Sequence, residues 1–358
     1  MPFCNTEKRA VASREARPES RGLIPAPILR QVIMKPFVFV TRTIPEPGLR
    51  LLRNRFEVTV GRQQAPIDRE TLKQGIEKAD ALICLLSDRI DGEILDQADR
   101  LKIIANYAVG YNNIDIRAAM EKNIMVTNTP GVLTNATAEL AFALIITLTR
   151  RILSADRYTR QGRFTGWDPL LFLGDELAGK ALGIVGMGRI GQSLAEKCRA
   201  FGMSVIYHNR HPLDKETEIR LGATFCSFEE LLARSDVVSI HAPLTDETRH
   251  LFNRSTFEKI KPGAFIINTS RGEVVDEAAL VEALVDERIK GAGLDVYEYE
   301  PTVTEKLTHM ENVVLLPHIG SATVETRSAM AVLAAENVIA ALEGKAPGNL
   351  VPEMAGRF

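Results

Sequence analysis

The feature that most constrains the fold is a glycine loop, Gly186-Met187-Gly188-Arg189-Ile190-Gly191, set between two short apolar runs. Leu182–Val185 precedes the loop, Gln192–Phe201 follows with apolar residues at helical spacing, and Ser204–Tyr207 is the second apolar run. This order predicts a strand, a turn, a helix and a strand. The first glycine permits the tight turn, the second lets the backbone approach a pyrophosphate, and the third lets helix and strand pack closely. With the free N–H groups of the helix start, the pattern predicts dinucleotide binding; the alternative is an ordinary glycine-rich turn.

The bulk properties of the chain limit the classes of protein to consider. Its 358 residues exceed one ordinary domain core, which suggests two domains. A net charge of −2 gives no indication of a nucleic-acid or membrane partner. The four cysteines have neither disulfide nor metal spacing and favour a reducing compartment, so we predict a cytoplasmic protein without a metal site. The most apolar run, Leu140–Leu148, is shorter than the roughly 20 residues that span a membrane.

Predicted strands and helices alternate along most of the chain, which favours an α/β fold with parallel sheets. We expect two Rossmann-like or flavodoxin-like domains. Residues 35–111 and 321–358 would form a discontinuous substrate-binding domain, and residues 112–320 would form the dinucleotide-binding domain. Within this scheme, residues 127–131 are predicted to be a turn, and a long helix is predicted from about residue 134 through Arg150 and beyond.

The first 34 residues differ in character from the rest of the chain. They contain several arginines with glutamates between them and show no hydrophobic periodicity. We interpret residues 1–34 as a disordered extension, or as the product of a start codon assigned upstream of Met34. A transit peptide is the alternative, although such peptides are poor in acidic residues.

Three polar residues, Arg271, Glu300 and His318, follow predicted strands at their C-terminal ends. In an open α/β sheet this edge is where ligands bind. The guanidinium of Arg271 suits a carboxylate and a neighbouring carbonyl oxygen, and His318 can protonate an oxygen at neutral pH. Glu300 can accept a hydrogen bond from the other ring nitrogen of the histidine. Behind a dinucleotide loop, this set predicts reduction of a ketone by hydride transfer, whereas each residue alone would be an unremarkable surface side chain.

Four motifs together resemble those of the D-isomer-specific 2-hydroxyacid dehydrogenase family, and the resemblance extends over about residues 35–351. They are the glycine loop, Asn268–Asp276 (NTSRGEVVD), Gly293–Pro301 (GLDVYEYEP) and Pro317–Ser321 (PHIGS). The resemblance implies that Arg271 binds a 2-oxo acid, that His318 is the acid/base and that Glu300 supports the histidine. It also implies a homodimer joined through the cofactor domains.

Within that family the chain looks most like the glyoxylate/hydroxypyruvate reductases. The motifs that carry this likeness are Tyr107–Asp115, Val126–Thr134 and Leu171–Gly174. They imply NADPH-dependent reduction of glyoxylate and hydroxypyruvate to glycolate and D-glycerate. Backbone groups of Val109 and Gly110 would hold the substrate carboxylate, and Leu86 would line a small substrate pocket. The alternatives are another D-2-hydroxyacid dehydrogenase, acting on phosphoglycerate, D-lactate or a bulkier 2-oxo acid, and a dinucleotide-sensing binding protein of the corepressor type.

The strand after the glycine loop bears on which dinucleotide is bound. NAD enzymes of this type place an acidic residue about 20 residues past the loop, where it contacts the ribose 2′-hydroxyl. Here the strand is followed by Asn209 and Arg210, so no carboxylate repels a 2′-phosphate and Arg210 can bind one. We therefore predict NADP(H), with NAD(H) as the alternative if Arg210 is only a solvated charge. The other residues of the predicted cofactor site lie in the glycine loop and the strand-end motifs: Gly186, Gly188, Arg189, Ile190, Gly191, Thr269, Ser270, Arg271 and Asp295.

Overall fold

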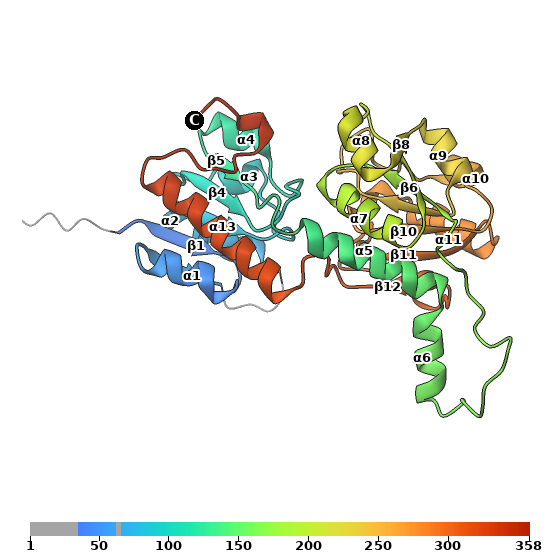
Figure 1. Cartoon of the computed structure of the whole chain (residues 1–358). Helices are drawn as coiled ribbons and strands as arrows, with labels where there is room; N and C mark the ends of the chain where they lie inside the picture. The colour runs from blue at the N-terminus through green and yellow to red at the C-terminus, as the bar shows by residue number, and fades with distance from the viewer. Residues whose placement is uncertain (1–34, 62–65) are drawn as a thin grey trace, which may run out of the picture. The chain divides into compact units, whose positions relative to one another are not determined.

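The computed structural model describes residues 35–61 and 66–358, so the extension predicted at residues 1–34 lies outside the described part of the chain. Within that part, strands and helices alternate, and the named strands pair only in parallel. They form a five-stranded and a seven-stranded sheet, hereafter the small and the large sheet (Figure 1). The predicted α/β class with two parallel sheets is confirmed.

The small sheet has the strand order β2-β1-β3-β4-β5. Its strands are β1 (Phe37–Val40), β2 (Glu57–Val60), β3 (Ala81–Cys84), β4 (Ile103–Asn106) and β5 (Met125–Thr127). The helices that cover it are α1 (Glu46–Arg53), α2 (Arg69–Lys78), α3 (Gly92–Leu95), α4 (Ile116–Glu121) and α13 (Val324–Leu342). Alternate strand residues pack against α1 and α13 on one face, where these helices lie side by side, and against α2, α3 and α4 on the other (Figure 1). Because α13 comes from the far end of the chain, this part of the molecule is discontinuous in sequence, as predicted.

The large sheet has the strand order β12-β11-β10-β9-β6-β7-β8. Its strands are β6 (Ala181–Val185), β7 (Ser204–His208), β8 (Ala223–Phe225), β9 (Val237–Ile240), β10 (Ala264–Asn268), β11 (Ile289–Leu294) and β12 (Val313–Leu315). Its helices are α5 (Thr134–Thr149), α7 (Arg189–Ala200), α8 (Lys215–Leu221), α9 (Phe228–Arg234), α10 (Arg254–Lys259), α11 (Glu277–Val285) and α12 (Glu305–Thr308). One buried cluster joins α5 and α7 to the sheet, and the other joins α9, α10 and α11 to it.

The order of strands in the large sheet changes direction at β6. β7 pairs with one edge of β6, and β9 pairs with the other edge. In a sheet of this kind, the crevice at the carboxyl ends of the strands on either side of such a switch is the usual site for a dinucleotide. The glycine loop follows β6 directly and therefore lies at that crevice.

The long helix predicted from residue 134 onward is in fact two helices. α5 ends at Thr149, and α6 (Ile152–Arg160) begins after Arg151, whose φ of 53° lies in the left-handed region. Two interactions of Thr149 mark the break. Its hydroxyl donates back to the carbonyl of Ile145, and its own carbonyl accepts a hydrogen bond from the backbone N–H of Asp175 instead of continuing the helix. The apolar spacing continues across the break, so periodicity alone does not detect it.

The boundary predicted between residues 111 and 112 does not coincide with the division between the sheets. β5 lies beyond that boundary and pairs with β4, in register Ile103 to Met125, so the small sheet continues to Thr127. The predicted turn at 127–131 thus follows a strand of only three residues. A strand of three residues is too short to show an alternation of apolar and polar side chains, so neither β5 nor β8 is predicted from the sequence. The sequence also does not predict the short helices α4 and α8.

None of the helices in the described part of the chain combines the length and apolar character that crossing a membrane requires.

Candidate active site

Arg271, Glu300 and His318 follow three neighbouring strands of the large sheet. Arg271 comes after β10, Glu300 after β11 and His318 after β12. Because these strands are parallel, their carboxyl ends meet at one edge, which is the ligand-binding edge of such a sheet. The structure therefore brings the predicted catalytic residues to the same side.

The imidazole of His318 is paired with the carboxylate of Glu300. Its Nδ1 lies 3.0 Å from Oε2 of Glu300, and Nε2 makes no contact with a partner among residues 35–61 and 66–358. Burial raises the pKa of Glu300, but the hydrogen bond and charge of His318 outweigh this effect and leave the pKa lowered overall. Because Nδ1 faces the carboxylate of Glu300, Nε2 is the ring nitrogen that is left available to a ligand oxygen.

Two buried residues hold the Glu300–His318 pair in place. Asp295 accepts hydrogen bonds of 2.7 Å from the backbone N–H groups of Ile319 and Gly320, directly after the histidine. Burial raises the pKa of this carboxyl group. Tyr297 donates its hydroxyl to the carbonyl of Leu316 at 2.7 Å, and its backbone N–H donates to Oε1 of Glu300 at 3.1 Å. His318 itself has a φ of 53°, a conformation that non-glycine residues adopt at a cost and that is concentrated at functional sites.

The guanidinium of Arg271 is held by two neutral oxygens. Nε donates to Oδ1 of Asn112 at 2.9 Å, and Nη1 donates to the carbonyl of Ser270 at 2.7 Å. Burial lowers the pKa of Arg271, whereas the charges of Glu300 and Glu273 act in the opposite direction. Arg271 forms no ion pair within the described residues, so its charge is not neutralised by direct contact.

Gly110 lies beneath this guanidinium. A Cβ built at Gly110 would overlap Nη2 of Arg271 and would lie 2.6 Å from its Cζ. The loop after β4 and the loop after β10 therefore meet at Gly110, and glycine at this position leaves the space that the arginine occupies.

The backbone around Gly110 has free donors. The carbonyl of Val109 accepts from Asn128 at 2.7 Å, and the carbonyl of Gly110 accepts from Asn106 at 2.8 Å. The N–H groups of Val109 and Gly110, by contrast, donate to no group in the described ranges. Successive free N–H groups beside a guanidinium form an environment that suits a carboxylate.

Leu86 lies in the loop that follows β3, and its side chain is 37% exposed. β3 is the neighbour of β4 in the small sheet. The loop is fixed by Asp88, whose Oδ2 accepts from the hydroxyl of Thr41 at 2.5 Å and from the backbone N–H of Leu85 at 2.7 Å. Asn113 donates to the carbonyls of Leu85 and Asp88 and so ties this loop to the segment that carries Gly110. Leu86 thus lies at the ligand edge on a loop that these hydrogen bonds hold in place.

The three glycines of the loop after β6 have different surroundings. Gly186 has a φ of 97°, and a Cβ there would lie 2.6 Å from the backbone nitrogen of Ala242. A Cβ at Gly191 would lie 2.7 Å from the carbonyl oxygen of Gly186. A Cβ at Gly188 would meet open space, and no side chain caps the N-terminus of α7 there. The first and third glycines are required by packing, whereas the second leaves the helix N-terminus open to an anion.

Other predicted cofactor residues surround this loop. Oδ1 of Asn209 accepts a hydrogen bond of 2.6 Å from the backbone N–H of Met187, so the end of β7 supports the glycine loop. Arg189 and Arg210 are exposed beside it, and Ile190 packs partly into the core under α7. At the end of β10, the hydroxyl of Thr269 is buried and has no partner in the described part of the chain. Ser270 is fixed by two contacts with Oδ1 of Asn268.

The chain is similar to known dehydrogenases over most of its length. Residues 142–320 match the D-isomer specific 2-hydroxyacid dehydrogenase, NAD binding domain. Over 322 residues the chain is 50% identical to a glyoxylate reductase from Thermococcus litoralis, covering 89% of this chain and 97% of that protein. The chain belongs to the D-isomer specific 2-hydroxyacid dehydrogenase family.

Solved structures of family members agree with this fold. A glyoxylate reductase from Paecilomyes thermophila is 35% identical, with a TM-score of 0.81 over 89% of this chain and 99% of that one. An NADPH-dependent glyoxylate/hydroxypyruvate reductase from Sinorhizobium meliloti, in complex with NADP and malonate, is 34% identical, with a TM-score of 0.78 over 89% and 97%. The family predicted from the motifs is confirmed, and the chain is an NAD(P)-dependent D-2-hydroxyacid dehydrogenase similar to glyoxylate reductases.

Some residues that shape this dehydrogenase site were not assigned a role from sequence. They are Asn112, which holds Arg271; Tyr297, which contacts the segments of both Glu300 and His318; and Asn106 and Asn128, which occupy carbonyls of the Val109–Gly110 loop. The one available signal is position, because Asn106 and Tyr297 lie at the ends of predicted strands, and Asn128 lies in the turn predicted at residues 127–131. Their partners are far away in the chain, and spacing does not reveal them.

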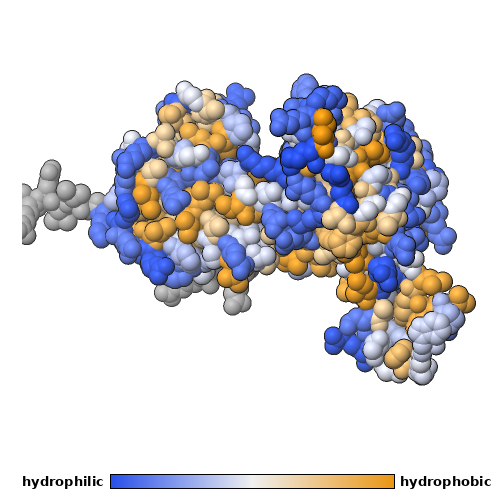
Figure 2. All heavy atoms as spheres, viewed as in Figure 1, coloured by the Kyte–Doolittle hydropathy of each residue, from blue (hydrophilic) through white to orange (hydrophobic). Residues whose placement is uncertain are grey.

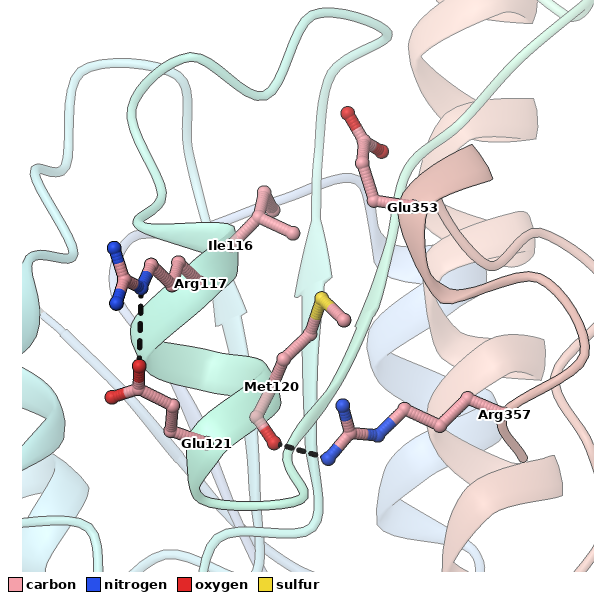
Figure 3. A pocket seen from close by; sticks show the side chains of 6 residues that line it. All are labelled: Ile116, Arg117, Met120, Glu121, Glu353 and Arg357. Carbon is pink, nitrogen blue, oxygen red and sulfur yellow. Dashed lines mark hydrogen bonds and ion pairs between the residues drawn. The ribbon is translucent and has the colours of Figure 1, made fainter.

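A separate cavity of about 440 Å³ lies between α4 and the C-terminal segment. Figure 3 shows Met120 and Arg357 at this cavity, joined by the hydrogen bond from the guanidinium to the carbonyl of Met120. None of the dehydrogenase residues predicted from sequence lines it. Across the described ranges, no group of three or more His, Cys, Asp or Glu side chains is arranged to hold a metal ion.

Proposed function

We propose that this dehydrogenase reduces glyoxylate, and also hydroxypyruvate, to glycolate and D-glycerate with NADPH. The proposal rests on one arrangement of groups. The guanidinium of Arg271 lies over Gly110, next to the free N–H groups of Val109 and Gly110, and the Glu300–His318 pair follows neighbouring strands at the same edge. The names of the similar proteins support the substrate class, since the relative from Thermococcus litoralis is a glyoxylate reductase. Leu86 would restrict the space next to the 2-oxo carbon and favour small acids.

The proposed mechanism assigns one task to each group of the chain. The N–H groups of Val109 and Gly110 and the guanidinium of Arg271 bind the carboxylate, and Arg271 also polarises the 2-oxo group. His318 donates its Nε2 proton to the oxygen of that group while the carbon gains a hydride. Glu300 stabilises the imidazolium before the transfer. When bound, a reduced nicotinamide would supply the hydride, so that the C=O bond would become CH–OH and the cofactor would be oxidised.

The residues of the predicted cofactor site fit a dinucleotide. The open N-terminus of α7 at Gly188 suits a pyrophosphate, and the unpartnered hydroxyl of Thr269 is a buried group that a bound ligand would satisfy. We propose NADP(H) as the preferred form, because the oxygen of Asn209 is already engaged by Met187 and its amide N–H₂ is left to face a phosphate beside Arg210. Arg189 would add positive charge at the same edge. Ser270 and Asp295 would complete the site near the nicotinamide.

We also propose that the small sheet with α13 binds the substrate, that the large sheet binds the cofactor, and that two chains associate through the cofactor side. α6 and the loop after it extend from the end of α5 (Figure 1) and carry exposed apolar residues, in part visible in Figure 2. They include Leu153 at 46%, Phe164 at 57% and Trp167 at 85% exposure. An apolar patch of this kind favours a protein–protein interface. Sedimentation of the Leu153→Glu/Trp167→Glu variant should show monomers where the wild type shows dimers, and dimers in both samples would exclude this surface.

The test of the proposed activity is a panel of 2-oxo acids assayed with NADPH and with NADH. We expect the highest kcat/KM for glyoxylate or hydroxypyruvate with NADPH. Turnover of only bulkier acids would assign the chain to another branch of the family. Tight dinucleotide binding without turnover of any acid would contradict an enzymatic role.

A further inference from the structure

We propose that Asn112 is a positioning residue for substrate binding, which fixes the guanidinium of Arg271 so that its free edge faces the Val109–Gly110 loop. The inference rests on the proposed function, in which Arg271 binds the 2-oxo acid. Asn112 lies between β4 of the small sheet and α4, and Arg271 lies after β10 of the large sheet. The hydrogen bond therefore joins a loop of the small-sheet part to a loop of the large-sheet part.

The orientation of a guanidinium is set by which of its nitrogens are held. Nε of Arg271 donates to Oδ1 of Asn112 at 2.9 Å, and Nη1 donates to the carbonyl of Ser270 at 2.7 Å. With these two atoms fixed, the plane of the fork is fixed as well. Nη2 is then left over Gly110, and it donates to no other group in the described residues. Without Asn112, only the contact with Ser270 would hold the side chain, and the fork could rotate away from Gly110.

The neutrality of Asn112 is also important. A carboxylate at Nε would form an ion pair with Arg271 and would compete with the carboxylate of a substrate. An amide oxygen gives the same geometry and leaves the positive charge uncompensated. In the part of the chain that the structure describes, no acidic group lies within ion-pair distance of Arg271, although Glu300 and Glu273 influence its pKa from farther away.

Asn112 has no other evident task in the fold. Its side chain is exposed and makes no further hydrogen bond within residues 35–61 and 66–358. Its neighbour Asn113, by contrast, donates to the carbonyls of Leu85 and Asp88 and so stabilises the loop that bears Leu86. Substitution of Asn112 should therefore change the site without changing the free energy of unfolding.

The experiment compares Asn112→Ala and Asn112→Asp with the wild type, using glyoxylate and NADPH. In Asn112→Ala, we expect kcat to fall about threefold and KM for glyoxylate to rise about threefold, since one hydrogen bond to a charged group is lost. Asn112→Asp restores the acceptor, so kcat should return to the wild-type value, while KM should stay above it because the new carboxylate competes for the guanidinium. The melting temperature and the affinity for NADPH should be unchanged in both variants.

Asn135→Ala is the matched control. Asn135 also accepts a hydrogen bond from a cationic side chain, Lys197, at 2.6 Å, but it lies on α5 away from Arg271. We expect this variant to keep the wild-type kcat and KM. An Asn112→Ala enzyme with both parameters within 1.5-fold of the wild type, or an Asn112→Asp enzyme with kcat as low as that of Asn112→Ala, would overturn the positioning role. A wild-type enzyme that reduces no acid of the panel would instead contradict the proposed function.

Discussion

The contact between Gly110 and Arg271 predicts a large loss of activity from the addition of one methyl group. In Gly110→Ala, the new Cβ would lie 2.6 Å from Cζ of Arg271 and would overlap Nη2. Carbon atoms in ordinary contact are about 3.5–4.0 Å apart, so the guanidinium must move by about 1 Å or more. A misplacement of about 1 Å can cost about 100-fold in rate. We therefore expect kcat/KM for glyoxylate to fall about 100-fold.

The same substitution should hardly affect the fold. The displaced atoms belong to the end of a long side chain and not to the backbone, and Gly110 does not have a positive φ, so alanine introduces no backbone strain. We expect the melting temperature to change by less than about 2 °C, which for a protein of this size corresponds to less than about 1 kcal/mol. The affinity for NADPH should also be retained, because the glycine loop and the α7 N-terminus are not involved.

The assay is steady-state oxidation of NADPH followed by absorbance, with glyoxylate varied, together with thermal unfolding of the same samples. Gly92→Ala is the matched control, since a Cβ at Gly92 would lie 3.8 Å from the side chain of Ala118, an ordinary contact, and should leave both measurements unchanged. If Gly110→Ala keeps more than a fifth of the wild-type kcat/KM, Arg271 does not act from the position seen here. If instead the variant unfolds, Gly110 has a structural role that the geometry does not indicate.

Three further variants test the other parts of the site. His318→Ala should lower kcat by about 10²–10⁴-fold at saturating glyoxylate, the usual contribution of a positioned acid, and a change of only a few-fold would remove the histidine from that role. Glu300→Gln removes a carboxylate whose lowered pKa keeps it ionised at neutral pH and which lies 3.0 Å from Nδ1 of His318, so the imidazolium loses its charged partner and kcat for reduction should fall by at least about tenfold. A kcat within twofold of the wild type would show that this charge does not act on the proton donor. Asn209→Asp combined with Arg210→Leu should shift the ratio of kcat/KM for NADPH over NADH at least about tenfold toward NADH, and an unchanged ratio would contradict the proposed cofactor preference.

The segments that could be predicted from sequence are those in which local pattern and tertiary setting agree. The glycine loop is one example. In the structure Gly186 has a positive φ and close backbone contacts, Gly188 leaves the N-terminus of α7 open, and Gly191 allows close packing against the loop. The alternation of strands and helices is another, since each buried parallel strand is a short apolar run. That Arg271, Glu300 and His318 share one edge could be predicted because the carboxyl ends of adjacent parallel strands lie on the same side of a sheet.

What could not be predicted depends on contacts between distant segments. Asn112 and Arg271 are 159 residues apart, and neither residue has a neighbour in sequence that points to the other. The break between α5 and α6 depends on the backbone N–H of Asp175, which takes the carbonyl of Thr149. β5 exists because β4 offers a pairing edge, and its three residues carry too little pattern of their own. In each case, tertiary hydrogen bonding decides a structure that local sequence leaves open.

The left-handed backbone of His318 combines a local cost, its positive φ, with support from a residue distant in sequence, Asp295. A φ of 53° at a residue with a Cβ costs on the order of 1–3 kcal/mol and needs support from its surroundings. Two hydrogen bonds from the following N–H groups to the buried Asp295, each worth about 1 kcal/mol, are of the right size to offset it. Nδ1 of His318 lies 3.0 Å from Oε2 of Glu300 and Nε2 is left free, so the contact with Glu300 determines which nitrogen can face a substrate. Asp295 therefore supports the site through the backbone at His318, whatever contact it makes with a cofactor.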